Sequence, residues 1–161
     1  MYRLLQFDTS GANTYQIVAS TDIHKPTPTG ISSTTRVLTR IEGFDEQENV
    51  QIITEPKLNG IGSYFVNSHI AEKEVSFDFN VSSGFYSTYR TLRNISLNPV
   101  GNRCKMTYST VNDTGTIQVS ESLSGGFIKS VRSTDVSNVN KDWGTISVVC
   151  LFPDPTITRE Q

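Results

Sequence analysis

Strict alternation of apolar and polar side chains over residues 74–81 is the sequence feature that most constrains the fold. In this segment, EVSFDFNV, the apolar side chains are those of Val75, Phe77, Phe79 and Val81. Successive side chains of a strand point to opposite faces of a sheet. The segment therefore predicts a strand with one buried face and one face that meets water or a partner.

Other segments extend the prediction of a β fold. Residues 104–120 predict a hairpin that turns at Asn112–Gly115, and residues 145–152 carry apolar side chains on both faces, which predicts a strand covered on both sides. Weaker alternation occurs over residues 2–7, in 14–20 (Tyr15, Ile17, Ala19) and in 36–43 (Val37, Thr39, Ile41). The content of Ser, Thr, Val and Ile suits strands better than helices.

One helix is predicted over residues 85–97. Its apolar stripe, spaced by four, three and three, consists of Phe85, Tyr89, Leu92 and Ile95. Ser82 or Ser83 is suited to cap the first turn, and Pro99 and Gly101 end the helix. The sequence thus predicts mainly β structure, a β-sandwich with one α-helix.

Two segments do not suit a compact sandwich. Residues 20–35 contain two prolines and few apolar side chains, and residues 43–60 begin acidic and become strand-like before the turn signal Asn59-Gly60. Long excursions of this kind are usually functional or disordered. We expect a single domain over 1–155 with both segments exposed as loops or arms, and 156–161 as a tail or the start of a linker.

Composition and charge exclude several classes of function. The net charge is −2 and the Lys and Arg side chains are scattered, which argues against binding nucleic acid by neutralising phosphates. No apolar run approaches the roughly 20 residues that cross a bilayer, and the first residues do not resemble a secretory signal. Without export, Cys104 and Cys150 are expected to be reduced and buried.

No pattern of reactive side chains marks a catalytic, cofactor or metal site. The two histidines, His24 and His69, have no nucleophile elbow near them in the sequence, and two cysteines far apart do not have zinc-ligand spacing. Trp143 is the single Trp, which weakens a glycan-binding interpretation, and we expect it in the core. The sequence predicts no enzyme and no catalytic, cofactor-binding or metal-binding residues.

The order of three blocks resembles the N-terminal, ring-forming domain of phage distal tail proteins of the siphovirus type. The blocks are SYFVNSHIAEKEVSFDFNV (63–81) after Asn59-Gly60, FYSTYRTLRNISLNP (85–99) and WGTISVVCLFPDP (143–155). Leu151 and Phe152 separate Cys150 from the Pro-Asp-Pro exit, so the closing match is approximate. Many family members continue into a second β-sandwich, and any carbohydrate binding by that domain lies outside this chain.

The resemblance implies a fold related to phage tail-tube subunits, with a protruding hairpin or belt. It implies a homo-oligomeric ring, a hexamer, at the tail tip of a virion assembled in the host cytoplasm. The implied partners are the tail-tube protein, the tail-tip protein and receptor-binding or baseplate proteins. DNA would pass through the ring without specific binding, and no membrane is involved.

Within this interpretation we expect residues 43–60 to form the belt. Val50, Ile52 and Ile53 would contact the next subunit, and Asp45, Glu46 and Glu48 would line the channel, where negative charge repels phosphate. Three alternatives stay open: a tail-tube or other baseplate subunit, a glycan-binding β-sandwich module and, least favoured by the sequence, an enzyme.

Overall fold

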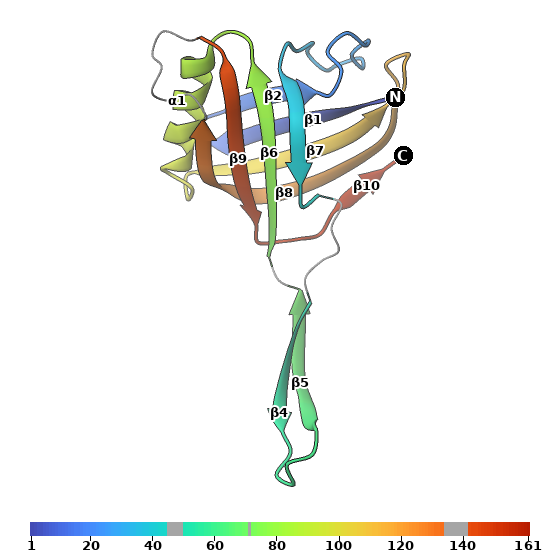
Figure 1. Ribbon diagram of the computed structural model, residues 1–161, viewed down its shortest axis with the longest axis vertical. Coiled ribbons are helices and arrows are strands. Elements are labelled where there is room, and N and C mark those ends of the chain that lie inside the picture. Colours follow the sequence, from blue (N-terminus) through green and yellow to red (C-terminus); the bar gives the residue numbers. More distant parts are fainter. Residues whose placement is uncertain (45–49, 71, 134–141) are drawn as a thin grey trace.

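The computed structural model describes residues 1–44, 50–70, 72–133 and 142–161, and Figure 1 shows a β-rich body from which one hairpin projects. The mainly β fold with one helix and a protruding hairpin is confirmed. The elements, in order, are β1 (Tyr2–Gly11), β2 (Tyr15–Ser20), β3 (Val37–Glu42), β4 (Val50–Pro56), β5 (Ser63–Ile70), β6 (Lys73–Val81), α1 (Phe85–Ser96), β7 (Asn102–Val111), β8 (Ile117–Ser133), β9 (Gly144–Phe152) and β10 (Thr158–Glu160).

The two layers of the body are parts of one sheet that closes on itself. Within the described residues, eight strands follow the order β10-β8-β7-β1-β2-β3-β6-β9, and β8 also pairs with β9. Neighbouring strands are antiparallel except β2 and β3, which run parallel and are joined by the single pair Ser20 and Val37. β4 and β5 pair with each other as a separate hairpin.

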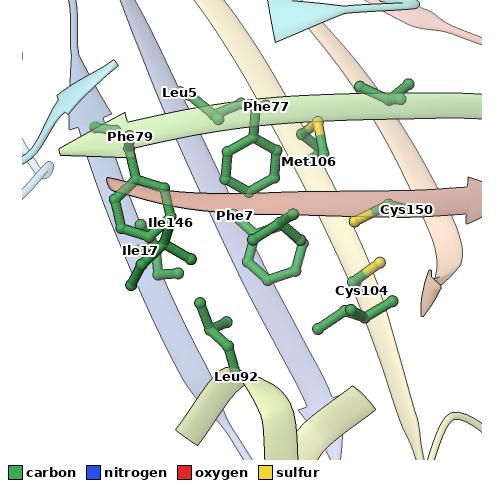
Figure 2. Packing of buried hydrophobic residues seen from close by; sticks show 14 of the residues in the cluster. Leu5, Phe7, Ile17, Phe77, Phe79, Leu92, Cys104, Met106, Ile146 and Cys150 are labelled. Atoms are coloured by element: carbon green, nitrogen blue, oxygen red, sulfur yellow. The ribbon is translucent and has the colours of Figure 1, made fainter. Parts of the chain in front are cut away.

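The core lies inside this closed sheet. All four apolar side chains predicted for β6 are buried, and the ring of Phe77 lies 5.5 Å from that of Phe7 and 5.9 Å from that of Phe79. Figure 2 shows Leu92 of α1 pointing toward Phe7. The predicted stripe of α1 is buried as expected, so the helix contributes to the same core.

Two strands differ from their predicted patterns. In β3 the alternation Val37, Thr39, Ile41 is wrong, because a bulge shifts the register between Leu38 and Arg40, which buries Leu38 and leaves Thr39 exposed. β9 was expected to be covered on both faces. One face is buried, whereas Val149 and Leu151 on the other face are half-buried. β9 is instead held on both edges, by β6 and β8.

The helix begins at a different cap from the one predicted. Neither Ser82 nor Ser83 caps α1; the N-cap is Gly84, with φ of 71° and no side-chain cap. The carboxylate of Asp142 accepts a hydrogen bond from the Gly84 N–H at 2.9 Å, and the Asp142 carbonyl accepts one from the Phe85 N–H at 3.2 Å. Asp142, which is distant from α1 in the sequence, thus caps the start of the helix.

The connection between β2 and β3, residues 21–36, lies along the body rather than away from it. Ile31 packs against a second cluster of Tyr2, Leu4, Val18 and Val111. The Tyr2 hydroxyl donates to the Pro26 carbonyl, and the Thr34 hydroxyl donates to the Val18 carbonyl at 2.5 Å. This loop therefore covers the outer face of β1 and β2.

Both cysteines are buried free thiols, as the sequence predicts. They lie near each other in the core in Figure 2, on β7 and β9. Burial raises the pKa of the Cys150 thiol well above its ordinary value, and its hydrogen bond with Cys104 acts in the same direction. Cys150 therefore stays protonated and packs as a small apolar side chain.

An ion pair on the outer face joins β3 to β6 and gives the fold a pH dependence. Arg40 binds both carboxylate oxygens of Asp78, at 2.9 and 3.2 Å. Burial alone would raise the pKa of Asp78, but hydrogen bonds from Arg40 and Ser147 hold that pKa below its usual value. A carboxyl group with a lowered pKa stabilises the fold above its unfolded-state pKa of about 3.9, and this contribution is lost as the pH falls through the folded-state pKa.

We expect Asp78→Asn to lower the free energy of unfolding at pH 7 by about 0.5–1 kcal/mol, because the solvent around the partly exposed Arg40 screens the pair. The difference from the wild type should vanish below the folded-state pKa of Asp78, which urea unfolding at several pH values would measure. Glu74→Gln is the matched control. The Glu74 pair with Lys129 has both side chains more than half exposed and should matter less. A pH-independent loss in Asp78→Asn would contradict the assignment.

Candidate assembly surfaces

The hairpin of β4 and β5 projects from one end of the body (Figure 1). Its strands are antiparallel, with Ile52 opposite Ser68 and Pro56 opposite Ser63, and a register shift lies between Ile53 and Thr54. An isolated two-stranded hairpin is only marginally stable in water. The hairpin is therefore a candidate for contact with another molecule.

The tip of the hairpin is an ordered turn. The Lys57 N–H donates to the Gly62 carbonyl at 3.1 Å, and the Gly60 N–H donates to the Lys57 carbonyl at 3.0 Å. The Asn59 side chain accepts from the Ile61 N–H at 3.0 Å. These bonds fix a turn that holds Leu58 and Ile61, with relative exposures of 107% and 76%, in solvent.

The hairpin concentrates exposed apolar side chains. Among the large apolar residues that the structure describes as exposed, those on the hairpin are Ile52, Leu58, Ile61, Tyr64 and Phe65. Exposed apolar side chains gathered on one projecting segment indicate a site of association or a risk of aggregation. The hairpin is consequently the strongest candidate for an intersubunit contact.

The predicted interface residues all lie on β4. Ile52 is 63% exposed, while the backbones of Val50 and Ile53 pair with Ile70 and Asn67. The predicted channel residues Asp45, Glu46 and Glu48 lie outside the described residues.

Sequence reasoning did not identify β5 as the partner strand of β4. The available signal was Asn59-Gly60 between two strand-like runs, which is typical of a hairpin.

An apolar groove lies at the end of the body opposite the hairpin. It has a volume of about 610 Å³ and is lined by loop 21–36, the start of β3, the end of β6 and the start of β9. β6 runs from the hairpin end at Lys73 to the groove at Val81, and β9 returns from Gly144. The two surfaces are thus separated by the length of these strands.

Most of the groove wall is apolar. The residues that matter for its chemistry are Ile23, Val37, Val81, Trp143, Asn80 and Thr145. The Thr145 hydroxyl donates to the Asn80 side-chain oxygen at 2.6 Å, so two polar groups of the wall bond to each other. None of the lining residues is ionisable, and an apolar group can therefore enter without displacing a charge.

Trp143 was expected in the core, and that expectation is wrong. Its side chain is 54% exposed and lies at the rim of the groove. The reason is that Gly144, the first residue of β9, packs directly against Phe85, where a Cβ would lie 2.8 Å from the ring. Because successive side chains of a strand point to opposite faces, Trp143, which precedes the inward-facing Gly144, points away from the core.

The described residues show no arrangement typical of a catalytic or metal centre. They contain no group of three or more His, Cys, Asp or Glu side chains placed to hold a metal ion. His24 is exposed in loop 21–36. No helix in the described residues is long and apolar enough to cross a membrane. That the chain is not an enzyme stays a prediction.

Comparison with known proteins gives structural likeness without sequence likeness. No protein-family profile matches the sequence, and no curated protein matches it. A chain from the sheath-tube complex of an extracellular contractile injection system, PVC, matches with a TM-score of 0.57 and 15% identity, over 97% of this chain and 87% of that one.

Two further structures have comparable similarity. The cap that terminates the tube of the anti-feeding prophage matches with a TM-score of 0.54 and 17% identity, over 96% of this chain and 87% of that one. The Dit protein of phage SPP1, from a hub adsorption apparatus, matches with a TM-score of 0.52 and 9% identity. This match covers 96% of this chain and 51% of the Dit chain. The chain therefore has a fold that tube, tube-cap and hub proteins of phage tails and contractile injection systems share.

Proposed function

We propose that this protein is a structural virion subunit that forms a ring, a hexamer, at the distal end of a phage tail. The ring links the tail tube to the tail-tip protein and to baseplate or receptor-binding proteins, and leaves a channel for DNA. The order of the three sequence blocks and the fold shared with Dit support this proposal. Assembly takes place in the host cytoplasm.

The observation that carries the proposal is the apolar hairpin. Exposed aromatic and aliphatic side chains on an arm that projects from the body have no role in the monomer, because the core is complete without them. A closed ring needs two different surfaces on each subunit that match each other. An arm that packs against or adds a strand to a neighbour supplies one of them.

In this ring, Val50, Ile52 and Ile53 of β4 contact the neighbouring subunit. Asp45, Glu46 and Glu48, just before β4, line the channel, where their charge keeps phosphate from binding. The exposed side chain of Ile52 supports the first assignment.

A tail-tube subunit is the second candidate. It is favoured by the presence of an apolar arm and an apolar groove at opposite ends of the body, since that arrangement suits rings stacked on one another. Rings of one layer would support the distal position, and long tubes would support the second candidate.

Replacing residues 50–70 with a short Gly-Ser linker should abolish ring formation while the body stays folded. In the part of the chain that the structure describes, the hairpin shares no strand pairing with the eight-stranded sheet, so its removal should leave the core intact. Light scattering after size exclusion and negative-stain imaging would measure assembly, and the cooperativity of urea unfolding would report the fold.

A milder variant, Ile52→Ser with Phe65→Ser, keeps the hairpin but removes apolar surface and should also weaken assembly. The matched control is Leu97→Ser with Val100→Ser, which changes two apolar side chains after α1 that are at least as exposed. Rings that persist without residues 50–70 would overturn the role assigned to the hairpin.

A further inference from the structure

We propose that Asn59, at the tip of the hairpin, is a site of spontaneous covalent modification, at which the backbone nitrogen of Gly60 displaces the side-chain amide and leaves isoaspartate. The reaction needs no enzyme, no cofactor and no second molecule, so it is independent of the proposed function. Three features of the tip support it: the residue that follows Asn59, the turn that holds its side chain, and the exposure of both residues to water.

The reaction is an intramolecular attack on the side-chain amide, in which both reacting groups are held in one turn. The backbone nitrogen of Gly60 loses its proton and bonds to Cγ of Asn59, which closes a succinimide ring. The bond from Cγ to the side-chain nitrogen breaks, and that nitrogen leaves with the proton as ammonia. Water then opens the ring: opening at the backbone carbonyl gives isoaspartate, and opening at Cγ gives aspartate. No group is oxidised or reduced.

Gly60 supplies the least hindered attacking nitrogen that a residue can offer. Asn59 is the only asparagine in the sequence that precedes a glycine. Because glycine has no Cβ beside the nitrogen, the approach to Cγ of Asn59 meets no side chain. Gly60 has φ of 74°, and apart from its chain neighbours no heavy atom lies within 4 Å of the position that a Cβ would occupy. The tip is therefore open around the attacking residue.

The turn at the tip presents the side-chain carbonyl to that nitrogen. Oδ1 of Asn59 accepts a hydrogen bond from the Ile61 N–H at 3.0 Å, which folds the side chain forward over the peptide that contains the Gly60 nitrogen. The same N–H polarises the carbonyl and stays with the oxygen as negative charge develops on it. Cγ of Asn59 is thus both placed and activated for attack.

One hydrogen bond must open before the nitrogen can react. The Gly60 N–H donates to the Lys57 carbonyl at 3.0 Å, which holds the proton that the reaction removes. In the described part of the chain, the hairpin strands pair with each other and not with the eight-stranded sheet. A two-stranded hairpin of this kind opens at little cost in free energy, so the bond slows the reaction without preventing it.

Asn112 provides an internal comparison in the same chain. Its side-chain oxygen also accepts a hydrogen bond from the N–H two residues ahead, that of Thr114, at 3.1 Å. The residue that follows is Asp113, whose Cβ crowds the backbone nitrogen, and the Thr116 N–H binds the same Asn112 oxygen at 2.8 Å. Asn112 therefore has the turn without the glycine, and we expect it to react more slowly than Asn59.

The modification converts an apolar tip into a charged one. The new carboxyl group is ionised at neutral pH, which changes the formal net charge from −2 to −3. The charge appears between Leu58 and Ile61, whose side chains are both exposed. Because an ionised carboxylate resists burial, a subunit whose tip stays in water loses its apolar tip with time.

Timed incubation of the whole protein in mildly alkaline buffer, followed by peptide mapping with tandem mass spectrometry, tests the proposal. We expect Asn59 to gain the mass difference between an amide and a carboxylic acid about tenfold faster than Asn112, or more, which corresponds to about 1.4 kcal/mol in the barrier. Enzymatic methylation of isoaspartyl groups would identify the product. Lowering the pH by one unit should slow the reaction by up to about tenfold, because less of the nitrogen is deprotonated.

Variants at the two reacting residues are the second measurement. Gly60→Ala adds the Cβ that hinders the nitrogen and should slow the reaction by about tenfold or more. Asn59→Gln keeps an amide but lengthens the side chain, so that a larger ring would have to close, and it should also suppress the reaction. Asn59→Asp carries the charge of the product and marks its position in isoelectric focusing. Urea unfolding should be the same for all three variants, because the hairpin does not pair with the described strands of the body.

The proposal is overturned if Asn59 gains a carboxyl group no faster than Asn112 in the same sample. It also fails if aspartate forms without isoaspartate, or if Gly60→Ala reacts as fast as the wild type, because either result means that water attacks the side chain directly. These outcomes leave the ring-forming role untouched, since that role is measured separately by replacing residues 50–70.

Discussion

Phe77→Ala is expected to lower the free energy of unfolding by about 3–5 kcal/mol. The side chain is fully buried on β6, between the rings of Phe7 and Phe79. Truncation removes apolar contacts and leaves a cavity that strands paired on both sides cannot collapse to fill. Urea unfolding followed by Trp143 fluorescence and circular dichroism would measure the loss.

Phe65→Ala is the matched control, because it makes the same chemical change at a side chain that is 66% exposed on the hairpin. In the unassembled protein it should change stability by about 0.5 kcal/mol or less. Equal losses in the two variants would mean that β6 does not form the centre of the core.

Gly43→Ala is expected to lower the free energy of unfolding by roughly 2–5 kcal/mol. Gly43 follows β3 where the chain leaves the body for the hairpin, and its φ is 92°. A Cβ there would lie 2.2 Å from the Glu74 carbonyl oxygen, which belongs to the backbone of β6 and cannot rotate away. The substitution adds backbone strain to a steric clash at the root of the arm.

Gly30→Ala separates the two contributions. Gly30 has a similar φ of 88° but no atom within 4 Å of the position of a Cβ, so only the cost of the left-handed conformation applies, about 1–2 kcal/mol. Chemical unfolding of both variants gives the difference. If Gly43→Ala lowers stability no more than Gly30→Ala does, the close approach of Gly43 to the Glu74 carbonyl oxygen is not rigid.

The parts of the fold that could be predicted are those in which local pattern and packing agree. The alternation in β6 and the apolar stripe of α1 each match the face that is buried. Both patterns arise because one face of a single element packs against the same core. β3 could not be predicted in the same way. Its bulge depends on pairing with β6, a segment far away in the sequence, and it moves Leu38 into the core.

The assembly surfaces were predictable only in part. The exposed arm was expected from its composition and turn signal, but the groove was not, since residues from separate segments, such as Ile23 and Thr145, meet there only in the folded chain. The position of Trp143 depended on Phe85 occupying the adjacent core site, and the cap from Asp142 likewise came from tertiary structure. A local sequence pattern does not show which distant segments come together in the folded chain.

The direction of one strand accounts for the existence of the groove. β2 and β3 run the same way, so the chain must travel back over the outside of the body before β3 can begin. That return path, residues 21–36, brings Ile23 and Thr35 to the rim and supplies a wall that a tight antiparallel turn would not provide. If β3 ran antiparallel to β2, a short turn could join the two strands, and the groove would lose the wall that residues 21–36 supply.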